Sequence, residues 1–493
     1  MITDVVDRQW AQAGDRLAIR DAAGDVTFSH LSAWSKTISA ALEPLVREPG
    51  QRVALMLPNS ARFAAAFFAV ARLGGVVAPL NPQYRAQELR YYLGDLEPAA
   101  LVTDAAGVEA VWDVESPADA RPAIVELVAR DGVRVARSPH GRPAPLASAG
   151  SPPLLQQYTS GSTGTPKRVV RTHATLLAEM EALREAFGVD AGDRFLGAAP
   201  FSHVNGLVRT MMTSMYVGAT LYPVAEFRRR EVLDLLTREQ ITLFGGVPQM
   251  FALLAQTPTR GDANLCALRL AFSSSAPLLS ADVDRFSAKY GVVLRQLYGS
   301  TETGTISLNR HPEPATCPQS VGAPLRGVRV DVVDEHGGAL AAGHEGELVI
   351  ASPFAASGYL GNPAATADSF RGGFYFSGDL GTKDAAGSVT ITGRKKLLIN
   401  RGGFKVNPYE VEAAIREHPD VADVAVYGAP SPHGDDVVCC AIVAATSCTA
   451  EAIVRHCRER IADYKVPTRI EFRDALPKST AGKVLRSQLV TAS

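Results

Sequence analysis

Short apolar runs alternate with longer apolar or amphipathic stretches over most of the first half of the chain. Residues 52–57 (RVALML) predict a buried strand, and residues 61–73 predict a helix that is apolar nearly all round. Gly74 and Gly75 end this helix, and residues 76–80 begin a second strand. A strand, a helix and a strand in this order predict a β-α-β unit of a parallel sheet with helical cover.

The alternation of strand and helix patterns continues after residue 154. Helices are predicted over residues 174–187, 229–239 and 280–290, and strands over residues 219–223, 242–247, 268–273 and 292–298. These elements predict an α/β fold, with a large N-terminal domain of parallel-rich sheets under helical cover.

Two later segments have different patterns. Residues 321–395 contain short β-runs between glycine-rich turns, which predicts a small β-barrel-like piece with more antiparallel pairing. After Gly393 the chain alternates helix and strand patterns, at residues 408–417, 421–427, 437–443 and 450–462. A tail of about 100 residues can pack a core of its own, so we expect a small α+β C-terminal domain.

Composition narrows the classes of function. The 493 residues are 46% hydrophobic and 20% charged, and the net charge of -1 indicates neither nucleic acid nor an anionic membrane as a partner. The N-terminus lacks a basic segment followed by an apolar run, and the most apolar stretch, residues 63–71, is too short to span a bilayer. The six cysteines have no zinc-ligand spacing. We therefore expect a cytoplasmic enzyme with free thiols and no membrane span.

Residues 158–167 (YTSGSTGTPK) form the strongest local motif. A loop of hydroxyl side chains and glycines can present backbone N–H groups and hydroxyls to an anion, and Lys167 adds a positive charge. The spacing is neither that of a Walker A loop nor that of a G-x-S-x-G elbow. Only ten of the 50 basic residues are lysines, so a lysine in such a loop indicates a specific role.

This loop resembles the phosphate-binding loop of the adenylate-forming superfamily, which includes acyl-CoA synthetases, peptide-synthetase adenylation domains and firefly luciferase. Four further motifs follow in that family's order, namely YGSTE at 298–302, YFSGD at 375–379, Gly393-Arg394 followed by Gly402-Gly403 and Lys405, and PKSTAGK at 477–483. Residues 50–92 resemble the family's opening β-α-β unit. The resemblance covers nearly the whole chain and implies an enzyme that uses ATP and Mg²⁺ to activate a carboxylic acid as its acyl-AMP.

The resemblance also implies a role for each motif. The groups that would bind ATP or AMP are Thr159, Ser160, Gly161, Ser162, Thr163, Gly164, Lys167, Ser274, Ser275, Ala276, Pro277, Tyr298, Gly299, Ser300, Thr301, Asp379, Arg394 and Lys483. Among them Thr301 would bond the α-phosphate, Asp379 and Arg394 the ribose, and Glu302 would bind Mg²⁺. Lys483 would stabilise charge between the carboxylate and the α-phosphate. A carboxylate is already a nucleophile, so positioning and electrostatics matter here more than a general base.

The acyl and thiol parts of the site follow from the same resemblance. His203 would form a wall between the acyl pocket and the thiol tunnel, and the pocket would be lined by His203, Asn205, Gly206, Val247, Ser273 and Leu297. Residues 1–393 would form the N-terminal adenylation domain, 394–396 the hinge and 397–493 a mobile C-terminal lid. The hinge residue would be Lys396, and Arg401, Gly402 and Gly403 would line the thiol tunnel.

Four positions depart from the family pattern. Leu297 stands where long-chain and aryl members commonly have glycine, which indicates a small or short acid. Arg168 replaces a usual glycine after the loop lysine. Leu397 replaces a usual aspartate, and Arg401 occupies a position that is usually small. The last two lie in the part that reorganises for the thiol step, so they bear on the acceptor rather than on adenylation.

Several functions remain open at this stage. The first is transfer of the acyl group to CoA, and the second is loading of the phosphopantetheine arm of a carrier protein. The third is use of the adenylate without a thiol, or activation of an unusually small acid. An α-amino acid substrate is disfavoured because residues 201–206 contain no aspartate. An inactive relative is disfavoured because Lys483, Glu302 and Asp379 are all present.

Overall fold

The structure is a computed structural model, which describes residues 1–112, 122–128, 132–137, 144–146, 150–159, 166–258, 264–278, 280–317, 319–401, 404–430, 436–479 and 483–490. The chain divides into two compact units. Unit 1 comprises Met1–Pro318, Pro324–Val328 and Ala351–Tyr375, and unit 2 comprises Gln319–Ala323, Arg329–Ile350 and Phe376–Ser493.

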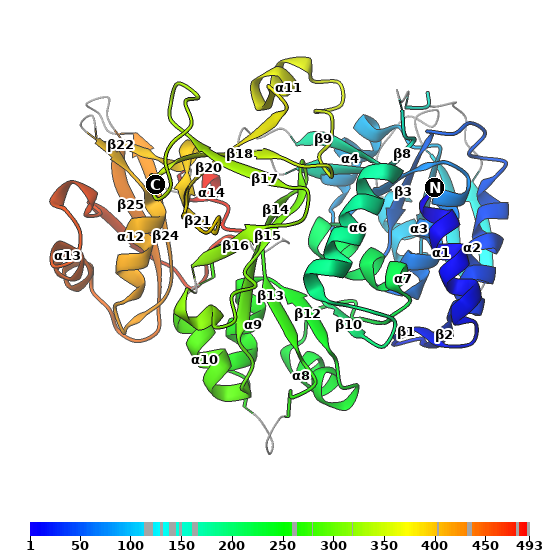
Figure 1. Cartoon of the computed structure of the whole chain (residues 1–493), viewed down its shortest axis with the longest axis horizontal. Helices are drawn as coiled ribbons and strands as arrows, with labels where there is room; N and C mark the ends of the chain where they lie inside the picture. The colour runs from blue at the N-terminus through cyan, green and yellow to red at the C-terminus, as the bar shows by residue number, and fades with distance from the viewer. Residues whose placement is uncertain are drawn as a thin grey trace. The chain divides into compact units, whose positions relative to one another are not determined.

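One sheet of unit 1 contains the predicted β-α-β unit (Figure 1). Its strands run in the order β7 (Gly132–Arg137), β6 (Ala123–Val128), β5 (Ala100–Thr103), β3 (Arg52–Met56), β4 (Val76–Pro79), β8 (Pro153–Thr159) and β9 (Lys167–Thr172). The five central strands are parallel, and β7 and β9 pair antiparallel at the two edges. The nearby helices are α2 (Phe28–Leu42), α3 (Ala61–Arg72), α4 (Ala86–Leu96) and α5 (Ala105–Trp112).

The second sheet of unit 1 carries most of the predicted site residues. Its strands run in the order β15 (Gly304–Leu308), β14 (Leu294–Ser300), β13 (Leu270–Ser273), β12 (Leu243–Gly246), β10 (Arg194–Gly197), β11 (Thr220–Pro223), β1 (Leu17–Asp21) and β2 (Gly24–Thr27). The strands from β14 to β1 are parallel, as predicted for this part of the chain.

The remaining helices and the short strand of unit 1 are α1 (Ile2–Ala13), α6 (His173–Phe187), η2 (Asn205–Met212), α7 (Thr213–Val217), α8 (Arg229–Arg238), α9 (Pro248–Ala255), α10 (Ser280–Tyr290), η3 (Pro314–Thr316), α11 (Pro363–Ser369) and β19 (Phe370–Arg371).

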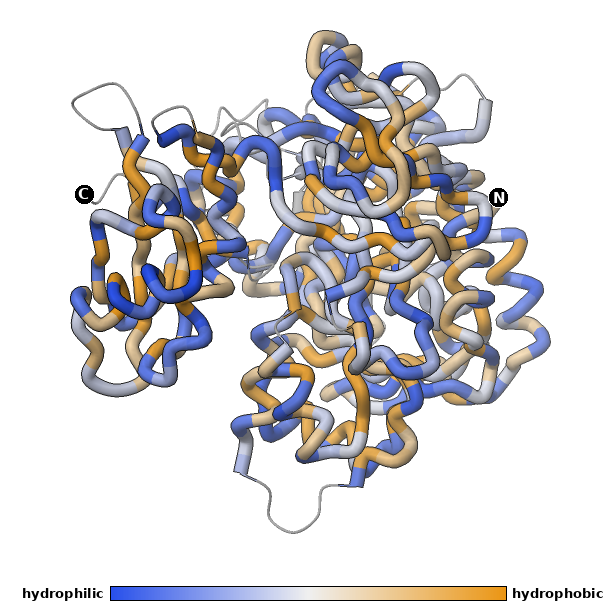
Figure 2. The backbone as a smooth tube through the Cα atoms, turned by 60° about the vertical axis from the view of Figure 1, so that its left-hand side comes forward, coloured by the Kyte–Doolittle hydropathy of each residue, from blue (hydrophilic) through white to orange (hydrophobic). Residues whose placement is uncertain are grey.

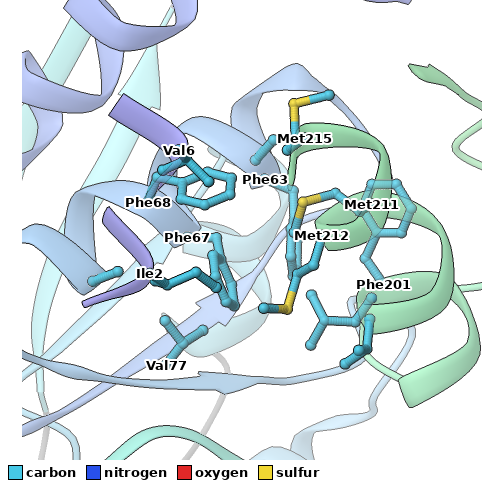
Figure 3. Packing of buried hydrophobic residues seen from close by; sticks show 14 of the residues in the cluster. Ile2, Val6, Phe63, Phe67, Phe68, Val77, Phe201, Met211, Met212 and Met215 are labelled. Atoms are coloured by element: carbon cyan, nitrogen blue, oxygen red, sulfur yellow. The ribbon is translucent and has the colours of Figure 1, made fainter. Parts of the chain in front are cut away.

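The main core of unit 1 lies where α3 packs against the helical segment η2–α7. The side chain of Ser60 accepts a hydrogen bond from the N–H of Phe63, which caps the start of α3. Figure 3 shows Phe63 and Phe67 of α3 beside Met211 and Met212 of η2, and all four side chains are buried. Burial of a side chain of this size contributes about 1.5–3 kcal/mol, so this contact holds η2 firmly at the position from which it presents its polar residues.

Unit 2 contains a row of strands followed by a small α+β sheet. The row is β17 (Arg329–Val333), β18 (Gly346–Ala351), β20 (Phe374–Lys383), β21 (Val389–Arg394) and β16 (Ser320–Pro324), and it includes the β-runs predicted within residues 321–395. After it come η4 (Lys395–Leu397), the hairpin of β22 (Ile399–Arg401) and β23 (Phe404–Val406), and the sheet of β24 (Val421–Pro430), β25 (Asp436–Ala444) and β26 (Arg469–Phe472). Helices α12 (Pro408–Arg416), α13 (Ala450–Arg458), η5 (Asp463–Lys465) and α14 (Ser487–Val490) accompany this sheet.

One predicted helix is shorter than expected. The pattern predicted a helix over residues 450–462, but α13 ends at Arg458. The N–H groups of Arg460 and Ile461 both bond the carbonyl of Cys457, so the chain turns there instead of adding another helical turn. The π-helical form of η2 was also not predicted, because apolar periodicity does not distinguish it from an α-helix.

Both units follow the expected alternation of buried and exposed segments, and Figure 2 shows apolar and polar stretches succeeding one another along the chain. Within the described ranges, no helix combines the length and the apolarity needed to cross a bilayer. The predicted hinge, residues 394–396, lies at the end of β21 and in η4, inside unit 2. The division of the chain at this hinge stays a prediction.

Candidate active site

The two ends of the predicted phosphate-binding loop are held together by a pair of antiparallel strands. Thr159 ends β8, Lys167 begins β9, and the two residues are directly paired. Between them, Ser160, Gly161, Ser162, Thr163, Gly164 and Thr165 lie outside the described part of the chain. The Nζ atom of Lys167 lies 4.2 Å from the centre of the Tyr359 ring, within the range of a cation–π contact.

Tyr359 connects Lys167 to the predicted magnesium ligand. Its hydroxyl donates a hydrogen bond of 3.0 Å to Oε1 of Glu302, whose side chain is buried. Burial and the negative charge of Glu302 raise the pKa of Tyr359, and the same two causes raise the pKa of Tyr375. Both phenols therefore stay protonated at neutral pH, and the hydrogen bond from Tyr359 orients the Glu302 carboxylate.

The chemistry of this group fits Mg²⁺. Mg²⁺ prefers oxygen ligands and is commonly held by one or two carboxylates together with phosphate oxygens and water. Glu302 supplies one buried and oriented carboxylate. Among the described residues, no group of three or more Asp, Glu, His or Cys side chains could hold a metal ion without such help. A metal here would therefore depend on the phosphates of a bound nucleotide.

The turn that carries Glu302 is stabilised by its own polar residues. Tyr298, Gly299 and Ser300 end β14, and Thr301 and Glu302 lie in the turn to β15. The Ser300 hydroxyl accepts a bond of 3.1 Å from the N–H of Thr303. Gly299 has no room for a side chain, because an added Cβ would lie 2.5 Å from the carbonyl oxygen of Gly304. Glycine is therefore required at this position by the close approach of the backbone.

The predicted adenine loop and acyl pocket meet at the carboxyl ends of β12 and β13. The carbonyl of Gly246 accepts hydrogen bonds from the N–H of Ser274 and from the side-chain amide of Asn205, at 3.1 and 3.2 Å. Ser275 has a φ of +76°, a strained conformation for a residue with a side chain. Ligands of open α/β sheets bind at such strand ends, and Ser273, Ser274, Ser275, Ala276, Pro277 and Val247 all lie at these two.

Helix η2 begins with residues predicted for the acyl pocket. It is a π-helix, a rare form that is often found at functional sites. His203 lies in the turn before it, where its backbone carbonyl accepts a bond from the N–H of Leu207. Gly206 lies against the preceding turn, because an added Cβ would be 2.2 Å from the carbonyl oxygen of Ala199. The structure thus gives Gly206 a packing role beside its predicted place in the pocket.

Leu297 and Arg168 each have a packing partner in unit 1. Leu297 is 3% exposed, belongs to the main apolar cluster and pairs with Leu308 across β14 and β15. It therefore fills space at the position where the family pattern has glycine. Arg168 donates to the carbonyl of Asp95 at 3.2 Å, and its Nη2 lies close to Gly361.

Unit 2 holds the predicted ribose and hinge residues. The Nε of Arg394 donates a bond of 2.5 Å to Oδ1 of Asp379, and the two residues are paired across β20 and β21. Asp379 is buried, and its N–H donates to the hydroxyl of Ser377. The predicted hinge residue Lys396 is exposed in η4. This strand pair presents a buried carboxylate beside a guanidinium, an arrangement that can accept hydrogen bonds from a diol.

The other predicted residues of unit 2 lie on its C-terminal segments. Lys483 is exposed, and its backbone is fixed by a reciprocal pair of bonds with Ser479. Arg401 donates from Nη1 to the carbonyls of Tyr464 and Val466, both at 2.9 Å, so it has a structural partner within unit 2. Gly402 and Gly403 lie outside the described residues.

The structure also shows polar residues that sequence reasoning missed. Tyr359 was not predicted, although its contacts join Lys167 to Glu302. Arg209 was not predicted either, although it is a buried charge within the apolar stretch of η2 and bonds Ser274. The available signal for Arg209 was its charge, since the other residues of η2 are uncharged. A cleft of about 670 Å³ near Leu268, Tyr290 and Pro312 contains none of the predicted site residues.

Comparison with known proteins places the chain in a family. Residues 6–360 match the family described as AMP-binding enzyme, and residues 410–483 match the AMP-binding enzyme C-terminal domain. The long-chain-fatty-acid–CoA ligase FadD13 of Mycobacterium tuberculosis is 30% identical over 495 residues, which cover 98% of this chain and 96% of that protein.

Two solved structures share the fold over the full length. The ATP-bound MatB of Rhodopseudomonas palustris has a TM-score of 0.90 at 29% identity and covers 100% of this chain and 99% of its own. The amide bond synthetase McbA of Marinactinospora thermotolerans has a TM-score of 0.86 at 27% identity, with full coverage of both chains. These likenesses confirm the α/β fold with a large N-terminal and a small C-terminal domain. The chain belongs to the AMP-binding, adenylate-forming superfamily, as an AMP-forming enzyme of the acid–CoA ligase family.

Proposed function

We propose that this enzyme activates a small carboxylic acid with Mg-ATP and transfers the acyl group to the thiol of CoA. In the first step a carboxylate oxygen attacks the α-phosphorus, the bond to the β-phosphate breaks, and pyrophosphate leaves. In the second step the thiol sulfur attacks the acyl carbonyl, its proton is lost to solvent, and AMP leaves. Both steps join or release anions, so they require fixed positive charge.

The observation that carries the first step is the contact of Tyr359 with both Lys167 and Glu302. It puts the lysine of the predicted phosphate loop and the predicted magnesium ligand next to one side chain. Mg²⁺ held by Glu302 would neutralise phosphate charge. Lys167 would bind the β- and γ-phosphates, Thr301 the α-phosphate, and Lys483 the charge that develops during attack. The ATP bound by the similar MatB supports the nucleotide assignment.

The buried Asp379 and its partner Arg394 support a ribose-binding role. A carboxylate accepts bonds from both hydroxyls of a cis-diol, and the hydrogen bond from Arg394 orients that carboxylate. The loop that begins with Ser274 would cover the adenine together with Tyr298.

The size of the acid is proposed from Leu297. Its side chain is buried in the apolar cluster and occupies volume that a glycine would leave free. The acid would lie near Asn205, Ser273 and Val247, with His203 between it and the thiol. FadD13 acts on long-chain acids, so the similarity of the chains does not carry the substrate over.

CoA is proposed as the acceptor because FadD13 is a CoA ligase and resembles this chain over nearly its full length. A second candidate is an acceptor other than CoA. The likeness to the amide bond synthetase McbA favours an amine, and the atypical Leu397 and Arg401 lie in the segment predicted to rearrange for the acceptor. A carrier protein with a phosphopantetheine arm would present the same thiol as CoA.

Pyrophosphate release from Mg-ATP tests both halves of the proposal. We would measure it with a panel of short, dicarboxylic, aryl and long-chain acids, each with and without CoA. Release with one class of short acid, made continuous by CoA, is expected. Release that CoA does not accelerate would overturn the acceptor and direct the search to amines or a carrier protein. Release only with long-chain acids would overturn the size argument from Leu297.

A further inference from the structure

A cluster of buried charges lies behind the predicted acyl pocket in unit 1. We define the Glu179 cluster as Arg171, Glu179, Arg209 and Thr305. Nη1 of Arg171 is 2.6 Å from Oε2 of Glu179, and Thr305 donates its N–H and its hydroxyl to Oε1, both at 2.7 Å. The Nε of Arg209 donates to the Thr305 hydroxyl at 2.9 Å. All four residues are buried, with Arg171 at 1% and Arg209 at 3% exposure.

The charges of the Glu179 cluster do not balance. Glu179 is ionised, because Arg171 and Arg209 overcome the effect of burial and keep its pKa below the ordinary value. Burial lowers the pKa of Arg209 to about 10, so its guanidinium is still charged at neutral pH. Within the part of the chain that the structure describes, Glu179 and Arg171 are the charged groups that act on Arg209. Two cations therefore share one anion, and a net positive charge is buried.

Arg209 carries the unbalanced charge. Arg171 contacts the carboxylate of Glu179 directly, whereas Arg209 reaches it through the hydroxyl of Thr305. Burying a charge without a direct partner is unfavourable by several kcal/mol, so such charges are normally paired or bind a ligand. The pair of Arg171 and Glu179 would be neutral without Arg209.

Arg209 lies among the residues predicted to bind the acid. It follows Asn205 and Gly206 along η2, and its Nη1 donates to the Ser274 hydroxyl at 3.3 Å. Its Nη2 lies against Gly299, where an added Cβ would be only 2.3 Å away. The guanidinium thus lies between the ends of β13 and β14.

Two further polar atoms near these strand ends lack a partner. Asn205 is 5% exposed and Ser273 is 2% exposed, and the Oδ1 atom of Asn205 and the hydroxyl of Ser273 have no hydrogen-bond partner in the structure. Buried polar atoms of this kind are nearly always satisfied in the functional state of a protein. The buried cation and the hydroxyl of Ser273 suit an anionic group, whereas Oδ1 of Asn205 can only accept a hydrogen bond and needs a donor.

We propose that the acid activated by this enzyme carries a second anionic group, which Arg209 binds, and that the substrate is a short dicarboxylic acid. This inference rests on the proposed function and names its substrate class. One carboxylate would attack the α-phosphorus and become the acyl-AMP, with loss of pyrophosphate. The other would stay ionised against Arg209 and balance the buried charge. The hydroxyl of Ser273 can donate to it, and the bulk of Leu297 limits the length between the two groups.

The test compares short dicarboxylic acids with their monomethyl esters in ATP–pyrophosphate exchange. The diacids are malonate, succinate and glutarate. The monomethyl ester of each keeps one carboxylate that can react but lacks the second negative charge. We expect kcat/KM for the preferred diacid to exceed that for its ester on the order of 10²–10³-fold, because a polar site left unpaired rejects the analogue strongly. Equal turnover of diacid and ester, or a preference for the ester, would overturn the proposal.

Two variants test whether Arg209 is the residue that distinguishes the diacid from its ester. Arg209→Met should lower kcat/KM for the diacid by on the order of 10²–10³-fold and change that for the ester by less than about threefold. Arg209→Lys should recover part of the diacid activity. The matched control is Arg52→Met, which removes another buried arginine, in the other sheet of unit 1, and should leave the ratio of diacid to ester unchanged. Equal losses for diacid and ester in Arg209→Met would mean that Arg209 serves the reacting carboxylate or the fold, which also overturns the proposal.

Thermal unfolding distinguishes binding from a structural role. Arg209→Met leaves the neutral pair of Arg171 and Glu179, so the unliganded variant should melt no lower than the wild type, and succinate or glutarate should no longer raise its melting temperature. A large fall in melting temperature without loss of the diacid preference would contradict the inference. If no acid of any class supports exchange with the wild type, the proposed function itself fails, which is a different outcome from activity with monocarboxylic acids alone.

Discussion

Two clusters of the same composition, one in each unit, behave differently because of their burial. In unit 1, Glu179 is accompanied by Arg171 and Arg209. In unit 2, Glu412 contacts Arg416 at 3.5 Å and Arg486 at 2.5 Å and accepts a bond from the N–H of Val426. Each cluster thus combines one buried glutamate with two arginines.

The two clusters differ in how far the second arginine is exposed to water and in whether another carboxylate lies near it. The side chains of Arg416 and Arg486 are 24% and 16% exposed, and Arg416 also approaches the carboxylate of Asp423. Water therefore solvates the arginines of unit 2, and Asp423 supplies a second carboxylate, which it shares with Lys478 at 2.8 Å. Arg171 and Arg209 have neither, so the excess charge of the Glu179 cluster is unfavourable unless a bound anion balances it. Burial of the cations, rather than their number, is what separates the two clusters.

The strongest test of this comparison removes the acid from each cluster. Glu179→Gln leaves two fully buried cations without an anion, and it should lower the free energy of unfolding by about 3–5 kcal/mol. Glu412→Gln leaves arginines that reach water, and it should cost about 1–2 kcal/mol. Urea unfolding of both variants measures the two values. Equal costs would show that exposure of the arginines does not separate the clusters.

A smaller effect is expected where the backbone supports Arg209. Gly299→Ala places a Cβ against Arg209 and the carbonyl of Gly304, and overpacking of this kind should lower the free energy of unfolding by about 1–3 kcal/mol. Gly428→Ala is the control from unit 2, since its Cβ would meet only side chains, those of Ile399 at 3.2 Å and Asp436 at 3.6 Å, and no backbone atom. Denaturant midpoints compare the two. If Gly299→Ala left the free energy of unfolding unchanged, the guanidinium of Arg209 would be free to move away from the added Cβ.

Sequence alone predicted the fold and the ATP motifs because these depend on local patterns. The parallel β-α-β unit at residues 52–80 follows from apolar runs and paired glycines, and the structure confirms it. Asp379 and Arg394 were predicted separately, and β20 and β21 pair them directly. Their roles stay predictions, as do those of Lys483 and Lys396.

The Glu179 cluster could not be predicted from sequence, for a physical reason. Arg171 lies on β9, an edge strand of one sheet, and Thr305 lies on β15 of the other sheet. Glu179 lies on α6 and Arg209 on η2. Their contacts therefore form only after long-range packing. Helical spacing places Glu179 on the face of α6 that carries Leu176 and Leu183, but it does not show which charges that face meets. Tyr359 was missed for the same reason, since it reaches Lys167 and Glu302 from a distant segment.

The pH dependence of stability sharpens the comparison further. The folded-state pKa of Glu179 lies below its ordinary value of 4.5, so its ionisation contributes stability above that pH, which is lost as the pH falls through the folded pKa. The difference in unfolding free energy between the wild type and Glu179→Gln should therefore be largest above about pH 4.5 and shrink below it. Urea titrations between neutral and acidic pH measure this difference. A difference that grows on acidification would contradict the assigned ionisation of Glu179.

The smallest effect is expected from the partly exposed arginine of unit 2. Arg416→Met removes a side chain whose contacts with Glu412 and Asp423 are 3.5 and 3.7 Å long and open to water. Such pairs contribute about 0–1 kcal/mol, and Arg486 remains on Glu412. Urea unfolding and ATP–pyrophosphate exchange of this variant should both stay close to the wild type, whereas Arg209→Met should change the choice of acid. If Arg416→Met altered that choice as well, the effect of Arg209 would no longer be specific to the buried cluster, and burial would lose its value as the sign of a ligand.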